Sequence, residues 1–189
     1  DEPKPGDKKP GNPGKKPGDG TPKTDVSYET LHRNMTRTIN VTDPHTGLHT
    51  TKVTIHYERT ATIDDVTGNV TYGDWTVADG SDTGFAKFDI PPVAGYTSEI
   101  KSGTADELNA LTPTQDQITN WSNQTVDIDY TANDQTGKIV YVDVDNKNVE
   151  VGHTNLTGKT DATITPAAPA GYDIVAGQNI PASEVATAT

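Results

Sequence analysis

The sequence contains no cysteine among its 189 residues. This absence excludes disulfide bridges, thiolate zinc sites and cysteine nucleophiles. Leucine is scarce as well, with five residues against 31 threonines. Because β-branched side chains suit the pleated surface of a strand better than a helix, this ratio favours strands and a mostly β fold.

Hydrophobic residues are also few, at 31% of the chain. No apolar run reaches the length of about 20 residues that a membrane-spanning helix needs. The composition therefore predicts no membrane insertion, and a thin core that is spread along the chain.

Positive charge is rare beyond residue 23. Residues 1–23 hold six of the 15 basic side chains but only four of the 27 acidic ones, so the rest of the chain is strongly acidic. The formal net charge of the whole chain is −12. Such a surface repels phosphate backbones and anionic lipid headgroups. The sequence therefore argues against nucleic acid as a partner.

Residues 1–23 contain six prolines and five glycines and almost no apolar side chain. Such a segment cannot bury enough surface to offset the entropy lost on ordering, so we expect an extended, solvated linker. Because the sequence begins inside this stretch, we expect the chain to be a piece of a longer protein.

After this linker, apolar residues recur at every second position. Residues 36–41 and 51–59 alternate in this way and flank a turn composition at 43–47, which predicts a β-hairpin. A second turn composition at 64–69 precedes an alternating segment at 70–77. Together these segments predict a β-meander.

Helix signals are confined to residues 104–118. Thr104 is an N-cap candidate with Glu107 three residues later, and Pro113 limits any helix to a short one. Residues 124–130 then alternate cleanly and predict the strand that closes this first unit.

A second unit repeats this order of elements in a shorter form. Residues 138–144 and 149–151 predict strands on either side of a polar turn. Both units then run through prolines into the tripeptide Ala-Gly-Tyr, which ends at Tyr96 in the first and at Tyr172 in the second. Glycine permits a tight turn there, and the tyrosine is expected to anchor it with its hydroxyl at the rim. No alternating segment follows residue 181, so the second unit is expected to lack its closing strand.

These residues resemble a known family. The stretch IVYVDVDNKNVEVGHTNLTGKTDATITPAAPAGYDIV is similar to the MucBP domain, in which a V-x-Y-V-D strand, an L-x-G-K segment and a P-x-G-Y corner follow one another. The segments TRTINVTDPHTG, TIHYERTATIDDVTGNVTYGDWT and FDIPPVAGYTS resemble the second half of a mucus-binding (Mub) repeat. The likeness covers about residues 35–181, and TGNVTYGDW is its most specific part.

We therefore predict a Pro/Gly-rich spacer over residues 1–23, a Mub-repeat B2-like module over 24–133 and a MucBP-like module over 134–189 that is truncated at its C-terminus. The resemblance implies an α+β, mostly β fold of tandem β-grasp (ubiquitin-like) modules that form an elongated rod. It also implies a secreted, cell-wall-anchored protein on the surface of a Gram-positive bacterium.

The function implied by the resemblance is that of a non-catalytic adhesin repeat that binds host mucus, with mucin glycans as the expected ligand. Each monomeric module would bind weakly, and a tandem array would gain strength through avidity. Two alternatives stay open: binding of host immunoglobulin through sheet edges, or a purely structural stalk spacer. No cofactor is implied.

Catalytic and metal-binding interpretations have little support in the sequence. Asp64 and Asp65 are adjacent carboxylates, but a Val-Thr-Gly turn follows them, so turn formation is favoured over glycosidase catalysis. Residues 143–148 lack the glycine and the final ligand of an EF-hand calcium loop, and only a looser calcium-binding turn is left open. His45 and His49 flank a turn with no visible third ligand. The sequence therefore predicts neither an enzyme nor a defined metal site.

Two aromatic side chains in the predicted sheet are candidates for ligand binding. Tyr57 and Trp75 could stack on sugar rings, but only 11 residues of the chain are aromatic, so core packing is the favoured alternative. The sequence does not choose the face that binds.

Overall fold

The computed structural model describes residues 26–164, 169–173 and 184–185, in which strands predominate over helices. The helices of the described chain are short: α1 Tyr28–Leu31, the 3₁₀-helix η1 Ala105–Leu108 and α2 Gln115–Thr119. None of these helices has the length and apolar character needed to cross a membrane. The predicted mostly β class is confirmed, whereas the predicted spacer over residues 1–23 lies outside the described residues.

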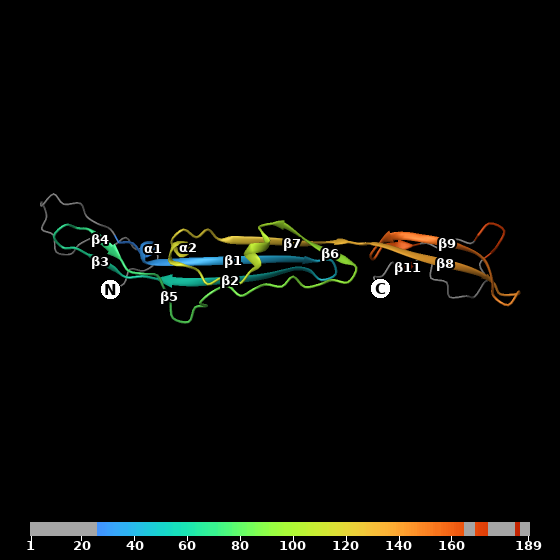
Figure 1. Ribbon diagram of the computed structural model, residues 1–189, viewed down its shortest axis with the longest axis horizontal. Helices are drawn as coiled ribbons and strands as arrows, with labels where there is room; N and C mark the ends of the chain where they lie inside the picture. Colours follow the sequence, from blue (N-terminus) through green and yellow to red (C-terminus); the bar gives the residue numbers. More distant parts are fainter. Residues whose placement is uncertain (1–25, 165–168, 174–183, 186–189) are drawn as a thin grey trace. The chain divides into compact units, whose positions relative to one another are not determined.

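The largest sheet has five strands in the order β5-β2-β1-β7-β6 (Figure 1). Its strands are β1 His32–Asp43, β2 Gly47–Glu58, β5 Thr76–Val77, β6 Tyr96–Ser102 and β7 Gln124–Ala132. β1 and β7 are parallel neighbours within the sheet, with Arg37 opposite Gln124 and Val41 opposite Ile128. The sequence predicted both strands, but it did not predict that β1 and β7, the first and last strands of this sheet along the chain, pair in parallel.

The β1–β2 hairpin forms where it was predicted. Alternate residues of β1 from Met35 to Val41 are buried, as expected for a strand with one face on the core. In the turn, Asp43 Oδ1 accepts 2.8 Å hydrogen bonds from the backbone amides two and three residues further on. Gly47 then adopts a left-handed conformation with φ +84°, which glycine allows without steric cost.

A second hairpin uses the same turn chemistry. β3 Ala61–Ile63 pairs antiparallel with β4 Val70–Tyr72. Asp64 Oδ1 accepts hydrogen bonds from the amides of Val66 and Thr67 at 2.8 and 2.9 Å. The turn role of Asp64 is therefore confirmed.

The prediction of one continuous strand over residues 70–77 is wrong. β4 pairs with β3, whereas β5 pairs with β2. Between them, the amide of Gly73 donates to the carbonyl of Thr60 at 2.9 Å. A Cβ at Gly73 would lie 2.7 Å from Thr60 Oγ1, so the backbone approaches Thr60 closely at this point. This approach separates the β3–β4 pairing from the β2–β5 pairing.

The predicted helix within residues 104–118 is present as two short helices. η1 begins after Thr104, whose amide donates to Glu107 Oε2 at 2.7 Å, as the spacing of a capping box predicted. Pro113 lies between η1 and α2, and a proline in a helix interior removes a backbone hydrogen bond. α2 has a second capping box, formed by Thr114 and Gln117, which was not predicted from the sequence.

The remaining strands form two small sheets. β8 Asp134–Asp143 pairs antiparallel with β9 Val149–Lys159, with an irregular register between Tyr141 and Val142. β10 Thr163–Ile164 pairs antiparallel with β11 Glu184–Val185. The sequence predicted the β8–β9 hairpin, but it did not predict a strand beyond residue 181.

The two Ala-Gly-Tyr corners form the same type of turn. The amides of Tyr96 and Tyr172 each donate to the carbonyl three residues earlier, at 3.1 Å. Gly95 and Gly171 have φ angles of +77° and +86°, which the third position of a type II turn requires. The anchoring differs, because Tyr96 is half-buried whereas Tyr172 is 49% exposed. Of the second predicted corner, residues 166–168 lie outside the described chain.

Contacts divide the chain into two compact units. The second unit comprises residues 42–47, 90–99 and the chain from residue 129 onward. The first unit comprises the rest, and it holds a buried cluster from strands, loop and helix: Met35, Ile55, Tyr57, Trp75, Phe85 and Ile118. This division by contacts does not test the predicted domain boundary after residue 133, which stays a prediction.

Candidate binding site

The two aromatic candidates from the sequence are both core residues. Tyr57 is 4% exposed and Trp75 is 7% exposed. Burial also raises the pKa of Tyr57. The indole N–H of Trp75 donates to Thr119 Oγ1 at 3.1 Å, and the guanidinium of Arg59 lies 4.3 Å from the centre of its ring. Neither ring therefore offers an open face to a sugar.

Asp64, one of the two adjacent carboxylates considered for catalysis, has structural partners, and so does Asp127 on β7. The amide of Thr67, and then that of Val66, hold the pKa of Asp64 below its usual value. Asp127 accepts a 2.8 Å hydrogen bond from Asn40 Nδ2 across the β1–β7 pair. Both side chains therefore have structural roles, Asp64 in a turn and Asp127 between two strands of the sheet.

The histidine and calcium hypotheses gain no support within the described chain, where no group of three or more His, Cys, Asp or Glu side chains is arranged to hold a metal ion. His45 contacts Asp161 rather than forming a metal-binding pair with His49. In the turn at 143–148, Asp143 Oδ1 accepts the amide hydrogen of Asp145 at 3.0 Å.

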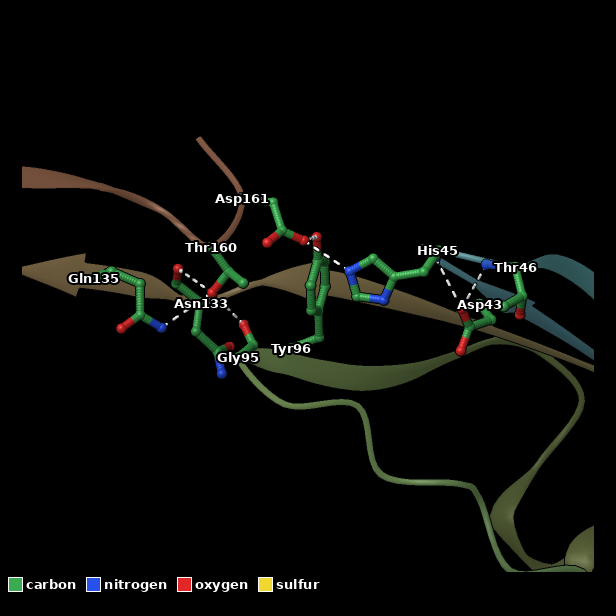
Figure 2. A network of polar contacts seen from close by, with 9 residues as sticks. All are labelled: Asp43, His45, Thr46, Gly95, Tyr96, Asn133, Gln135, Thr160 and Asp161. Atoms are coloured by element: carbon green, nitrogen blue, oxygen red, sulfur yellow. Dashed lines mark hydrogen bonds and ion pairs between the residues drawn. The ribbon is translucent and has the colours of Figure 1, made fainter. Parts of the chain in front are cut away.

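Asp161 joins three segments of the second unit (Figure 2). Its Oδ2 accepts a 2.8 Å hydrogen bond from the Tyr96 hydroxyl and lies 2.8 Å from His45 Nε2. The rings of His45 and Tyr96 meet edge to face at 5.5 Å. The hydrogen bond with His45, followed by that from Tyr96, lowers the pKa of Asp161, and the bond to Asp161 raises the pKa of Tyr96.

The neighbouring residue, Thr160, is buried and ties further segments together. Its Oγ1 donates to the Gly95 carbonyl at 2.7 Å and accepts from Gln135 Nε2 at 3.0 Å. Its amide donates to the Asn133 carbonyl at 2.9 Å. We refer to the residues drawn in Figure 2 as the Asp161 network: Asp43, His45, Thr46, Gly95, Tyr96, Asn133, Gln135, Thr160 and Asp161. The network fixes the fold of the second unit, and none of its contacts identifies a ligand.

A surface groove of about 490 Å³ lies in the first unit. We call it the Trp121 groove, and its lining consists of Glu107, Asp116, Gln117 and residues 120–124. Trp121 is half-buried, and its ring stacks on Phe85 with 5.6 Å between centroids and 19° between planes. The groove thus combines one aromatic ring with amides, carboxylates and a hydroxyl, and it is more polar than most small-ligand sites.

Trp121 was not among the binding residues predicted from the sequence. The available signal was its place in the polar stretch Thr119-Asn120-Trp121-Ser122-Asn123, because binding residues lie disproportionately on loops. No signal in the sequence places Glu107 beside it, since that requires the tertiary fold.

The fold defines a class, a mostly β module whose surface carries shallow polar grooves. A family model, the Muc B2-like domain, matches residues 26–134. The chain therefore belongs to the Muc B2-like domain family, which confirms the resemblance to mucus-binding repeats. The family indicates an adhesin-like binding role and is not a known enzyme family.

Two solved structures are similar to this chain. The mucin-binding domain of Spr1345 from Streptococcus pneumoniae is 23% identical, with a TM-score of 0.32, over 52% of this chain and 89% of that chain. The MucBP domain of the adhesion protein from Pediococcus pentosaceus is 27% identical, with a TM-score of 0.30, over 53% of this chain and 98% of that chain. No curated protein matches the chain.

Proposed function

We propose that this chain is a non-catalytic module of a bacterial cell-surface adhesin and that it binds host mucus through mucin glycans. The observation that carries the proposal is the match of the Muc B2-like family model over residues 26–134. The acidic composition supports a short-range mode of binding, by hydrogen bonds and ring stacking, because bulk charge would repel sialylated mucin.

The proposal includes the arrangement of the parent protein. The strand order β2-β1-β7-β6 with a parallel β1–β7 pair supports a β-grasp module, and the repeated type II corner supports a second, related module over residues 134–189. Tandem modules behind an extended spacer on a secreted, wall-anchored protein would bind weakly one by one. Linking them raises the effective concentration of each site without new contacts.

Immunoglobulin binding is a second candidate, which one observation favours. β6 is the terminal strand of the five-stranded sheet, and a terminal strand is the position at which another chain can add by main-chain hydrogen bonds. A partner bound in this way would be recognised as protein, and removal of glycans would leave the binding unchanged.

A binding comparison on three surfaces tests these functions. The chain, displayed as a multimer to compensate for weak single sites, is passed over immobilised mucin, immunoglobulin and serum albumin. Retention on mucin alone supports the proposed function, and retention on immunoglobulin alone favours strand addition. Equal behaviour on all three surfaces would contradict a binding role and leave the stalk spacer.

A further inference from the structure

Three surface hollows of the described chain differ in what they can recognise. The one lined by Arg37, Val53 and Phe85 measures about 130 Å³, below the range of about 300–1,000 Å³ typical of ligand sites. The one beside Thr97 and Lys159, of about 410 Å³, has no aromatic side chain in its lining. The Trp121 groove has both the size and the aromatic ring.

A pyranose sugar has an apolar C–H face and a rim of hydroxyl groups, so its site needs a flat aromatic surface beside hydrogen-bonding groups. Trp121 supplies the surface. One face of its ring stacks on Phe85, which holds the indole in a fixed orientation, while the side chain is still exposed enough to line the groove.

Three of the four amide side chains of the groove supply hydrogen bonds, whereas Asn120 Nδ2 already donates to the Asp116 carbonyl at 3.1 Å. Gln117 Oε1 accepts from the amide of Thr114, Asn123 Oδ1 from the amide of Thr36, and Gln124 Oε1 from Arg37 Nε, at 2.9–3.1 Å. These bonds fix all three amides through their oxygen atoms. Within the described chain their NH₂ groups make no hydrogen bond, so each is a positioned donor for a ligand oxygen.

The charge of the groove selects against anionic ligands. Glu107 and Asp116 are both in the lining, and no basic side chain of the described residues is. A sialic acid carboxylate or a sulfate would meet like charge there, whereas an uncharged sugar would meet acceptors for its hydroxyl hydrogens.

The indole N–H of Trp121 is a further sign of a role beyond packing. Its Nε1 is buried and has no hydrogen-bond partner among the described residues, a state that destabilises a folded protein. A phenylalanine would stack on Phe85 without this unpartnered donor. The larger ring also packs against the buried cluster of the first unit, and contact with a ligand would add a second role to that packing.

From these contacts we propose that the Trp121 groove binds one neutral hexose or N-acetylhexosamine residue, stacked on Trp121, and discriminates against sialylated and sulfated sugars. This inference rests on the proposed glycan-binding function and names its site and ligand class. Such residues occur both in mucin O-glycans and in bacterial cell-wall glycan, and the chemistry of the groove suits either source.

The two indole N–H signals of Trp75 and Trp121 provide a direct probe, because the chain has only these two tryptophans. The ¹⁵N-labelled chain is titrated with N-acetyllactosamine to about 20 mM, which covers the millimolar affinity of weak single sites. We expect a saturable shift of the Trp121 signal and none of the Trp75 signal. Sialylated N-acetyllactosamine should bind roughly fivefold more weakly, the factor for one like-charge pair near 4 Å in water.

Matched variants locate the site. Trp121→Phe should weaken N-acetyllactosamine binding about tenfold or more, as expected for an aromatic anchor. Trp75→Phe should leave the affinity within about twofold, because that ring is buried in the core. Asp116→Asn should reduce the discrimination against the sialylated sugar. Backbone amide spectra of each variant verify that the fold is retained.

Several outcomes would overturn the inference: no shift of the Trp121 signal, equal binding of neutral and sialylated sugar, or equal losses in the two tryptophan variants. If the Trp121→Phe variant still binds mucin as the wild type does, the site is wrong and the proposed function stands. If the Trp121 signal shifts with sugar but mucin is not bound, the site stands and the mucin assignment fails. Parallel titrations with desialylated mucin glycans and soluble cell-wall glycan then identify the source.

Discussion

Trp75 and Trp121 are the same side chain in two different surroundings, and their hydrogen bonds separate their roles. The N–H of Trp75 donates to Thr119 of α2, whereas the N–H of Trp121 has no partner among the residues that the structure describes. The core residue contributes to stability, and the groove residue is the better candidate for contact with a ligand.

The core of the first unit is small, so single truncations within it should be costly. Ile55 is fully buried on β2, and Ile55→Ala should lower the free energy of unfolding by about 2–5 kcal/mol through lost burial and a residual cavity. Leu48 on the same strand is 65% exposed, and Leu48→Ala should change the free energy of unfolding by less than about 0.5 kcal/mol. Urea unfolding of both variants measures the difference, and similar losses would contradict the assigned core.

The Asp161 network predicts a loss of stability in acid. Its contacts with His45 and Tyr96 lower the pKa of Asp161 in the folded state below the value of about 3.9 expected when unfolded. A carboxyl with a lowered folded pKa stabilises the fold fully above its unfolded pKa, and this contribution disappears as the pH falls through the folded value. Wild type should therefore lose stability below about pH 4.

The control is Asp161→Asn, which cannot titrate. Asp43 and Asp64 also have lowered pKa values, because the amides of His45 and Thr67, respectively, donate to them, so both proteins should weaken in acid. The free energy of unfolding of the variant should fall less than that of wild type between pH 5 and pH 2. Equal acid losses in urea titrations across this interval would show that Asp161 makes no such contribution.

At the level of single residues, the sequence was a better guide to turns than to binding groups. Asp43 and Asp64 could be assigned because turn chemistry depends on a few neighbouring residues. Tyr57 and Trp75 were chosen as binding candidates from strand segments, but alternation in a strand is the pattern that turns a side chain inward. Trp121 lay outside any periodic segment, and its groove exists only after Glu107 and α2 are brought beside it.

The strands and hairpins of the chain were largely predictable, whereas their pairing was not. The β1–β2 and β8–β9 hairpins follow from alternation on either side of a turn. The parallel pairing of β1 with β7 joins segments whose local sequences carry no sign of each other. The break between β4 and β5 depends on the contact of Gly73 with Thr60, which is likewise invisible in the local pattern.

Thr160 tests whether buried hydrogen bonds stabilise the elements of the second unit. Thr160→Val keeps the shape of the side chain but removes the hydroxyl that links Gly95 and Gln135, and should lower the free energy of unfolding by about 1–2 kcal/mol. Thr160→Ser retains the hydroxyl and should cost less than about 1 kcal/mol, the value of one buried methyl group. A valine variant as stable as the serine variant would contradict this role.

For the whole molecule, the net charge of −12 predicts how salt affects binding to mucin. Raising the ionic strength from 10 to 150 mM shortens the Debye length from about 30 Å to about 8 Å and so screens the repulsion between two anionic partners. The association rate with sialylated mucin should therefore rise with salt, and the rate with desialylated mucin should change less. Kinetic binding measurements at both salt levels provide the test, and a rate that falls with salt would indicate attraction between charges instead.

The central claim is that the chain recognises glycans of mucin. The most direct measurement is the binding of the multimerised chain to one mucin preparation before and after chemical removal of its O-glycans. The proposed function predicts that the apparent affinity falls about tenfold or more when the glycans are removed, since the contacts that stabilise the complex go with them. Undiminished binding to the bare mucin polypeptide would contradict the claim and indicate recognition of protein.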